Sequence, residues 1–501
     1  MTDNRTEPIA EAIASVRSDA LVAYLQKQRW FAAKGSTPTD ARISGFVIAP
    51  WGGDTFAFAR ARVVVGGVEH VYQLPLATRT SAPADVPANA VLSTSPFALY
   101  DAVYDSDFRT GLVNALATGA TASGGGSRWV AEPAHPGRFV VPEDVVTRLG
   151  SAEQSNTSIV VGNFAILKLF RTLKTGIHPD VEVTRFLTTR AGFANTPSLL
   201  ASMRFEDASG SATSGMVQTF LAGSSDAWSY ALSKGKSYFV TGSEPPNSFL
   251  EDAKRLGAVT RAMHDALASD ESDPPFAPEP ATHEDLDRWT SRVAESIRGS
   301  LALLETQLQS PRFPPQRLPE AKALVGRRDH FVAWVDEIAD AIGDDLGDLI
   351  RVHGDYHLGQ VLRTAAGDFS VIDFEGEPSR SLEERREKTS PLRDVAGMLR
   401  SFAYAAATLA TSVEKSLDMP TRELRSARWE RDARAAFLSG YLANTDDDAP
   451  GILPEEAEHV HLLIALFEAE KAFYELAYEL NNRPGWAWIP MRGISKLLTK
   501  R

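Results

Sequence analysis

The spacing of apolar residues changes at about residue 247, and this change limits the fold more than any other feature of the chain. Before it, runs rich in β-branched and aromatic residues alternate with glycine pairs, which is typical of strands joined by tight turns. After it, apolar residues recur mostly at helical spacing. The sequence therefore predicts an α+β protein with its strands mainly in the first half and a large helical part in the second.

The first 130 residues are predicted to form a domain with an antiparallel sheet. A helix is expected up to about Gln28, and strands are expected over Ala41–Val47, Thr55–Val65 and Val68–Leu74. The glycine pairs between these strands suit hairpin turns.

Three further segments complete this domain. Residues 79–96 are rich in Ala, Pro, Ser and Thr, so we expect a loop there. Pro96–Leu116 is expected to be helical. Thr121–Ser127, with three consecutive glycines, is expected to be a flexible connection.

A second domain over residues 131–222 and a third over 223–501 are expected. Strands dominate from about Phe139 to Phe170, a helix follows over about Pro179–Thr189, and a short strand over Met216–Phe220. In the third domain, His353–Asp373 has strand–loop–strand character. Helices are expected over Glu251–Leu267, His283–Gln307, Pro319–Ala341, Pro391–Val413, Arg422–Leu442 and Glu455–Asn481.

Length, composition and charge exclude several classes of protein. The 501 residues exceed what one hydrophobic core usually organises, and the formal charge of −13 disfavours a nucleic-acid partner. The chain has no cysteine, which excludes disulfides, thiolate metal sites and a cysteine nucleophile. The first residues do not resemble a signal peptide and no stretch is apolar enough to span a membrane, so we expect a cytoplasmic protein without a membrane partner.

The segment Val352–Glu377 is the most informative for chemistry. Asp355 and Asp373 flank a predicted hairpin, and Gln360 adds an amide oxygen near the first of them. A hairpin brings its two ends together, so these side chains are expected at one site. Phosphoryl transfer needs such a set: one carboxylate orients the attacking hydroxyl, while a second carboxylate and an amide hold Mg²⁺.

These residues resemble a known family. The pattern H-G-D-x-H-x-x-Q followed by I-D-F-E is similar to the catalytic and metal-binding loops of aminoglycoside-phosphotransferase-like kinases, which are relatives of the protein kinases. The longer run from His353 to about Ala406 resembles bacterial maltokinases. The resemblance implies that Asp355 is the catalytic base and that Gln360 and Asp373 bind Mg²⁺.

Structural roles for single residues of this segment remain open. An isolated aspartate is more often a turn or capping residue, and it is the combination at this spacing that favours catalysis. His353 is expected to be a packed, hydrogen-bonded residue. His357 either approaches the substrate or shapes the loop.

An ATP-binding part is expected upstream. Lys168 lies in an apolar strand and Glu182 on the next predicted helix, as in kinases, where a strand lysine holds phosphates and a helix glutamate orients it. A strand lysine is also often an edge residue whose stem packs on apolar surface. The turn-rich loop containing Ser155, Asn156 and Thr157 is expected near the phosphates. Gln218 and Phe220 are expected at the adenine.

The C-terminal helix offers candidates for the sugar. Tyr474 and Tyr478 lie four residues apart on one helical face, with Asn482 beyond them. The alternative is a solvated helix with a buried aromatic stripe, but the run from Lys471 to Trp486 resembles the corresponding maltokinase segment.

Residues beside the catalytic loops complete the predicted site. Glu375 and Arg393 are further candidates for the sugar, and Asp394 is expected to support the catalytic loop. Near the N-terminus, the run from Gln28 to Gly35 resembles the opening of the maltokinase cap domain. Trp30 and Phe31 in it are expected to be core residues.

The resemblance predicts a bilobal protein-kinase-like fold with an N-terminal cap domain and a large helical C-terminal lobe. The expected reaction transfers the γ-phosphate of ATP, with Mg²⁺, to maltose, giving maltose 1-phosphate for α-glucan synthesis. Alternatives are a glucosamine kinase, an aminoglycoside phosphotransferase and an inactive kinase-like binding module. The expected partner is the small-molecule sugar, and the protein is expected to be a monomer or a homodimer.

Overall fold

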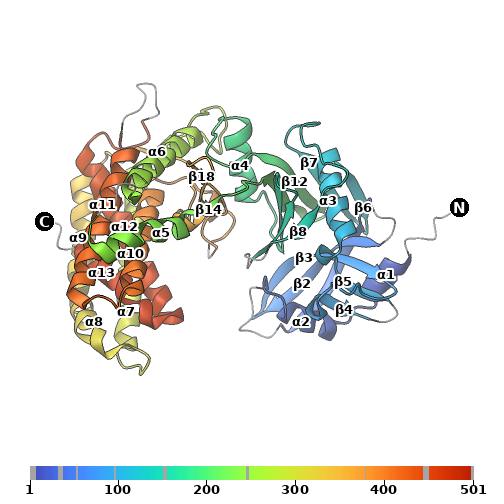
Figure 1. Ribbon diagram of the computed structural model, residues 1–501, viewed down its shortest axis with the longest axis horizontal. Coiled ribbons are helices and arrows are strands. Elements are labelled where there is room, and N and C mark those ends of the chain that lie inside the picture. Colours follow the sequence, from blue (N-terminus) through green and yellow to red (C-terminus); the bar gives the residue numbers. More distant parts are fainter. Residues whose placement is uncertain are drawn as a thin grey trace. The chain divides into compact units, whose positions relative to one another are not determined.

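The computed structural model describes residues 7–31, 38–51, 55–94, 97–150, 155–243, 248–378, 380–443 and 451–497. The chain packs into two compact units. The first unit holds residues 1–190 and 197–222, and the second holds residues 191–196 and 223–501. Figure 1 labels the elements of each unit.

The first unit contains two antiparallel sheets. Their strand orders are β1-β2-β3-β5-β4, with β11 added beside β3, and β6-β7-β12-β13-β10-β9-β8. In chain order the elements are α1 (Glu7–Ala14), α2 (Ser18–Gln26), β1 (Asp40–Ile48), β2 (Phe56–Val65), β3 (Val68–Arg79), η1 (Ala88–Ala90), β4 (Val91–Ser93), β5 (Ala98–Asp101), η2 (Ala102–Tyr104), α3 (Ser106–Thr118), β6 (Thr121–Gly124), β7 (Ser127–Pro133), β8 (Thr147–Leu149), β9 (Asn156–Val161), β10 (Ala165–Phe170), β11 (Thr172–Leu173), α4 (Pro179–Thr189), β12 (Leu199–Asp207) and β13 (Gly210–Thr219).

One hydrophobic core joins the two sheets of the first unit. Phe58 of β2 stacks on Trp129 of β7, with 5.2 Å between ring centroids, and both belong to a cluster that also includes residues of β9, β10, β12 and β13. Directly after β10 of the second sheet, the chain crosses to the first sheet, where β11 pairs antiparallel with β3. The domain boundary expected after residue 130 falls within β7. The division into three domains stays a prediction.

The strands expected over residues 41–74 are confirmed as β1, β2 and β3, and three neighbouring predictions are corrected. The expected loop over residues 79–96 contains the short strand β4. The expected helix Pro96–Leu116 begins only at Ser106, because its first part contains the buried strand β5, and a run as short as Ala98–Tyr100 does not distinguish strand from helix. Thr121–Ser127 is not a flexible connection, because Thr121–Gly124 is strand β6, and Gly125 and Gly126, both with positive φ, form the tight turn to β7.

The second unit is mainly helical. Around α10 pack α5, α11, α12 and α13, drawn in green to red in Figure 1. The elements are β14 (Ser225–Asp226), α5 (Ala227–Thr241), α6 (Phe249–Leu267), β15 (Glu279–Pro280), α7 (His283–Gln307), η3 (Pro315–Arg317), α8 (Leu318–Val325), α9 (Arg328–Ile342), β16 (Asp348–Leu349), η4 (Leu358–Gln360), β17 (Val361–Arg363), β18 (Phe369–Val371), η5 (Glu384–Arg386), α10 (Leu392–Ser412), α11 (Met419–Tyr441), α12 (Ala457–Asn482), η6 (Pro484–Trp486) and α13 (Trp488–Leu497).

The predicted helices of the second unit are largely confirmed. Helix α7 has the expected bounds, and the Asp285 carboxylate accepts hydrogen bonds from the backbone N–H and the hydroxyl of Thr282, which fixes its start. The single helix expected over Pro319–Ala341 is wrong, since α8 and α9 are separate helices on either side of Gly326 and Arg327. Helices α5 and α13 were not predicted.

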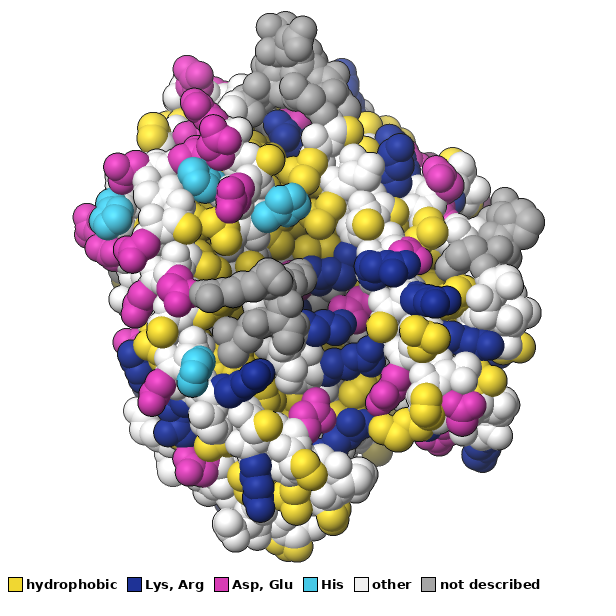
Figure 2. Space-filling model, turned by 90° about the vertical axis from the view of Figure 1, so that its left-hand side faces the viewer, with side chains coloured by type: hydrophobic (Ala, Val, Ile, Leu, Met, Phe, Trp, Pro, Cys, Tyr) yellow, Lys and Arg dark blue, Asp and Glu magenta, His cyan; other side chains and the backbone are white. Residues whose placement is uncertain are grey.

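A groove on the surface of the second unit lies between α9, α11, α12 and α13. Figure 2 shows the side of the molecule that carries these helices, on which a group of basic side chains gathers. Lys496 of α13 and Glu430 of α11 form an ion pair of 2.7 Å there. Among the described residues, no helix is long and apolar enough to cross a membrane.

Candidate active site

The predicted hairpin is confirmed in the second unit. Strands β17 and β18 pair antiparallel, and the backbone N–H of Ile372 donates to the carbonyl of Gln360 at 3.0 Å. Gln360 therefore lies across the hairpin from the residue that precedes Asp373. Asp373 itself has a φ of 70°, the only positive φ among the described residues other than glycine. A backbone held in this region points to a positioned side chain.

The loop that carries Asp355 is fixed by a buried carboxylate. Asp394, at the start of α10, accepts hydrogen bonds from the backbone N–H groups of His353 (2.7 Å) and Gly354 (2.9 Å). A further support is His264, whose Nε2 lies 3.2 Å from Asp394. Burial opposes ionisation of Asp394, but the hydrogen bond from His264 and the surrounding donors outweigh it and lower its pKa. The predicted supporting role of Asp394 fits these contacts.

His353 packs inside the site, as predicted. It is 1% exposed, and its Nε2 lies 2.9 Å from the carbonyl of Ile372. This contact ties the loop before β17 to the segment after β18. His357 caps the short helix η4, because its Nδ1 accepts the N–H of Gly359 at 3.0 Å. Partial burial lowers the pKa of His357, which favours the neutral imidazole that this hydrogen bond needs.

Asp355 lines a cavity of about 130 Å³ within the second unit. The walls come from the loop that carries Asp355, from Gly376, Glu377 and several residues within 380–389, from the start of α10, from α12, and from the part of α7 that contains Trp289. Ionised side chains line much of it. The cavity is therefore suited to a small, strongly hydrogen-bonding molecule rather than to an apolar one.

Six charged side chains of this cavity form a chain of ion pairs with alternating signs. The N–O distances along it are 3.3, 3.7, 3.1, 3.9 and 2.5 Å. In order, the members are Asp355, Lys471, Glu377, Arg380, Glu470 and Arg393. Three positive and three negative charges balance, so the chain as a whole is neutral.

Burial favours the neutral form of both Lys471 and Arg393, but their carboxylate neighbours offset it to different extents. It would lower the pKa of Lys471, but the carboxylates of Asp355 and Glu377 outweigh it and raise that pKa. The pKa of Arg393 is lowered by its burial, which Glu470 only partly offsets. One guanidinium nitrogen of Arg393, Nη2, is buried without a hydrogen-bond partner among the described residues. This donor is therefore available to an acceptor on a ligand.

The predicted sugar residues divide into two groups. Arg393 and Tyr474 line the cavity. His357, Glu375, Tyr478 and Asn482 lie outside it. Tyr478 is 47% exposed, and the Asn482 amide donates to the carbonyl of Tyr478 at 2.8 Å.

The cavity also contains charged residues that sequence reasoning missed. Glu377, Arg380, Glu470 and Lys471 all line it. In the sequence, Glu470 and Lys471 are indistinguishable from the charges of any solvated helix. They line the cavity only because α12 packs against α10 and beside the loop that carries Asp355.

The predicted phosphate-binding lysine lies in the first unit. Lys168 is on β10 between β9 and β13, opposite Ser158 and Met216, and is 6% exposed. Its Nζ donates to the Asp180 carboxylate of α4 at 3.0 Å, and Asp180 is fully buried. Asp180 was not predicted. Glu182, the expected partner, is half-buried and follows in the same first turn of α4.

The other predicted nucleotide residues lie on or next to β9 and β13, the two strands that flank β10. Asn156 and Thr157 begin β9, where Thr157 is opposite Leu169 and accepts a hydrogen bond from Arg171 at 2.8 Å. Ser155 is exposed just before the strand, and residues 151–154 of the same loop lie outside the described part. Gln218 is buried in β13. The N–H of Phe220 donates to the carbonyl of Phe164 at 2.8 Å.

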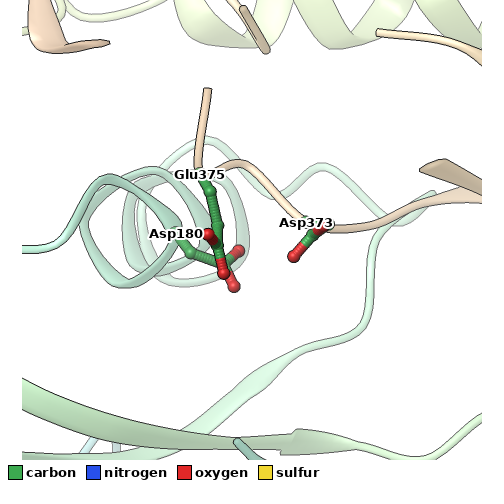
Figure 3. Close-up of side chains that lie close together, drawn as sticks. All are labelled: Asp180, Asp373 and Glu375. Atoms are coloured by element: carbon green, nitrogen blue, oxygen red, sulfur yellow. The ribbon is translucent and has the colours of Figure 1, made fainter. Parts of the chain in front are cut away.

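The side chains after β18 suit a divalent cation. Asp373 and Glu375 are two residues apart and half-buried; both are labelled in Figure 3, with Asp180 of the first unit. Carboxylate and amide oxygens are hard ligands of the kind that Mg²⁺ prefers. Asp373, Glu375 and Gln360 thus have the donor chemistry for this ion.

Comparisons with known proteins agree with these observations. Residues 24–105 match the family model of the maltokinase N-terminal cap domain. Curated glucosamine kinases from Streptacidiphilus jiangxiensis and Mycolicibacterium smegmatis are 26% and 25% identical to this chain. Each match covers 70% of this chain, and 73% and 78% of the respective relative.

The fold has solved counterparts of the same length. A structure described as glucosamine kinase in complex with glucosamine, ADP and inorganic phosphate has a TM-score of 0.68 at 21% identity, covering 99% of this chain and 100% of that one. The chain is a relative of the protein-kinase-like sugar kinases. The predicted fold class, the resemblance and the prediction of a sugar phosphotransferase are confirmed. The match over residues 24–105 also confirms a cap domain at the N-terminal end.

Proposed function

We propose that this sugar kinase relative transfers the γ-phosphoryl group of ATP to glucosamine in a Mg²⁺-dependent reaction. The observation that carries the proposal is Asp355 in the wall of a small cavity lined by ionised side chains. The curated relatives that span 70% of the chain are glucosamine kinases, which supports the same acceptor.

The chemistry follows from the position of Asp355. A hydroxyl oxygen of the sugar attacks the γ-phosphorus, the bond between that phosphorus and the bridging oxygen of ADP breaks, and the hydroxyl proton passes to Asp355. Asp355 then releases the proton to solvent. The products are a sugar phosphate, ADP and a proton.

The remaining roles are divided between the two units. Lys168 binds the phosphates of ATP, with its strand held by β9 and β13 on either side. Asp373, Gln360 and Glu375 would hold Mg²⁺, whose positive charge offsets the charge of the phosphates. Arg393 and Tyr474 bind the sugar, and Arg393 uses the Nη2 donor left without a partner among the described residues.

The size of the cavity favours one sugar ring over two. At about 130 Å³ it is smaller than the roughly 300–1,000 Å³ of pockets that enclose drug-sized ligands. A monosaccharide brings many hydroxyl groups in a compact volume. Its hydroxyls suit the alternating carboxylates and cations of the wall, since each such group is either an acceptor or a donor.

Maltose is the second candidate acceptor. It is favoured by the cap-domain match over residues 24–105 and by the maltokinase-like run from His353 to about Ala406. A second sugar ring would extend past the cavity towards the exposed side chains of Tyr474 and Tyr478 on α12.

The experiment that tests both candidates measures ADP release with glucosamine, glucose, maltose and kanamycin as acceptors. We expect kcat/KM for glucosamine to exceed that for maltose by roughly 10- to 100-fold, because a lost polar contact costs about 1–3 kcal/mol. If kcat/KM for maltose is higher than for glucosamine, maltose is the acceptor and the proposed kinase mechanism still holds. Activity on none of the four would refute the proposed function.

A further inference from the structure

Lys471 occupies the position of a counter-ion beside the proposed base. Its Nζ lies 3.3 Å from Oδ1 of Asp355 and 3.7 Å from Oε1 of Glu377. The ammonium group also lies over the ring of Tyr474, 5.3 Å from its centroid. Two carboxylates and an aromatic face thus hold one ammonium group in the wall of the sugar cavity.

This ammonium group is well placed to position the base. The Lys471 side chain is 30% exposed and that of Asp355 24%, so the pair is partly shielded from water. A hydrogen bond to an ionised group restricts where a carboxylate points. Glu377 is fixed in turn by Arg380 at 3.1 Å, so Lys471 connects Asp355 to the rest of the ion-pair chain.

The same arrangement bears on the charge of the acceptor. Because the six-residue chain is already neutral, a neutral sugar leaves its balance unchanged. Without Lys471, Asp355 and Glu377 would face each other with a vacant place for a cation. An ammonium group on the acceptor has the chemistry to take that place, whereas a hydroxyl does not.

We propose that Lys471 is a positioning residue for Asp355 and sets how strongly the site distinguishes cationic from neutral sugars. The inference rests on the proposed function for its kinetic consequences. It concerns the acceptor class, since glucosamine and glucose differ only in carrying an ammonium or a hydroxyl group at one carbon. The Lys471 ammonium and the ammonium of an amino sugar compete for the same pair of carboxylates.

Kinetics with these two sugars test the proposal. In Lys471→Met, kcat/KM for glucose should fall roughly 10- to 100-fold, while that for glucosamine falls less, so that their ratio changes about tenfold towards glucosamine. Lys471→Arg keeps the charge and should restore much of the glucose activity. Glu377→Gln removes one of the two carboxylates and should shift the ratio the opposite way.

The matched control is Lys496→Met. Lys496 also forms a partly buried ion pair in the second unit, with Glu430 at 2.7 Å, but in the groove between α9, α11, α12 and α13. The substitution Lys496→Met should leave the ratio of the two kcat/KM values unchanged. An equal loss with both sugars in Lys471→Met, without rescue by arginine, would reduce Lys471 to a structural residue and overturn the proposal.

Calorimetric binding of the two sugars separates this inference from the proposed function. The ratio of their Kd values should change about tenfold towards glucosamine in Lys471→Met, whether or not either sugar is phosphorylated. An unchanged ratio, or no binding of either sugar to either protein, would overturn the proposal. Failure of turnover alone, with the expected shift in Kd, would refute only the kinase reaction on these sugars.

Discussion

Arg171 and Asp101 form an ion pair of 2.8 Å in which each side chain is only 1% exposed. Arg171 directly follows β10, the strand that carries Lys168, and its Nε donates to Thr157 of β9. Asp101 ends β5 of the other sheet and accepts the hydroxyl of Tyr24 at 3.0 Å. One buried pair therefore links the sheet of the cap-like part to the two strands assigned to the nucleotide.

Breaking this pair should destabilise the protein strongly. Arg171→Met leaves Asp101 charged and buried, and such losses amount to roughly 3–5 kcal/mol in the free energy of unfolding. Urea denaturation measures the change. The double variant with Asp101→Asn should lose less than the sum of the single variants, because neither charge then remains alone.

An exposed pair is the control for that prediction. Arg17 and Asp19 also form an ion pair at 2.8 Å, but they are 81% and 67% exposed. Arg17→Met should change the free energy of unfolding by less than about 1 kcal/mol. Equal effects of the two arginine substitutions would contradict a linking role for Arg171.

The base and the metal ligand are separable by two isosteric substitutions. Asp355→Asn keeps the shape of the side chain but cannot accept the proton, so kcat should fall by about 10²–10⁴-fold with little change in the affinity for ATP·Mg²⁺. Asp373→Asn should instead raise the Mg²⁺ concentration needed for half-maximal activity. Initial rates over a Mg²⁺ titration distinguish the two. The opposite pattern would exchange their roles.

Lys168 should govern nucleotide binding alone. Lys168→Met is expected to abolish most ATP binding, measured by calorimetry, while the sugar still binds. Asp180→Asn should weaken ATP binding more than Glu182→Gln, because Asp180 forms the ion pair of 3.0 Å with Lys168. If Glu182→Gln has the larger effect, Glu182 is the functional partner of Lys168, as the sequence predicts.

Local patterns predicted those parts of the fold whose causes are local. The bounds of α7 follow from helical spacing and from the Thr282–Asp285 start signal, and the hairpin β17–β18 follows from two apolar arms around a turn. The motif from His353 to Asp373 indicates the family in the same way, from one short run of the chain. Each of these features depends on residues that are close together in the sequence, so the local sequence pattern is enough to predict it.

Partners far apart in sequence could not be predicted in this way. Lys471 meets Asp355 only because α12 packs beside the catalytic loop, and no spacing rule connects residues so distant. The choice between Asp180 and Glu182 for Lys168 depends on how α4 lies against β10. The hairpin β6–β7 was missed because glycine-rich sequences suit both a mobile connection and a tight turn with positive φ.

Asp368, in the turn between β17 and β18, should make the stability of the protein depend on pH. Arg255 of α6 donates two hydrogen bonds of 2.9 and 2.8 Å to the Asp368 carboxylate. These bonds are the main reason why the pKa of Asp368 is lowered to about 2. Because this lies below the unfolded value of about 3.9, the stabilisation is present above roughly pH 4 and is lost as the pH falls through about 2. The pair is 52% and 39% exposed, so screening limits it to about 1 kcal/mol or less.

The thermal midpoints of wild type and Asp368→Asn provide the measurement. Their difference should be largest near neutral pH and should shrink as the pH approaches about 2. Arg255→Gln should show the same pH dependence, because it removes the other half of the pair. A difference that stays constant over this range would mean that Asp368 acts through the shape of the turn rather than through its charge.

Gly354 is a position beside Asp355 where a side chain is poorly tolerated. Its φ is 82°, which side-chain-bearing residues rarely adopt, and a Cβ there would lie 3.2 Å from the Cα of Gly376. Gly354→Ala should therefore displace the backbone beside Asp355, lowering kcat and costing about 1–2 kcal/mol of stability.

The matched control is Gly299→Ala within α7, where nothing lies within 4 Å of the added Cβ. That substitution should stabilise the protein by roughly 0.5–1 kcal/mol without changing kcat. Activity and thermal midpoints of both variants decide the matter, since wild-type turnover in Gly354→Ala would show that the close approach to Gly376 does not position the base.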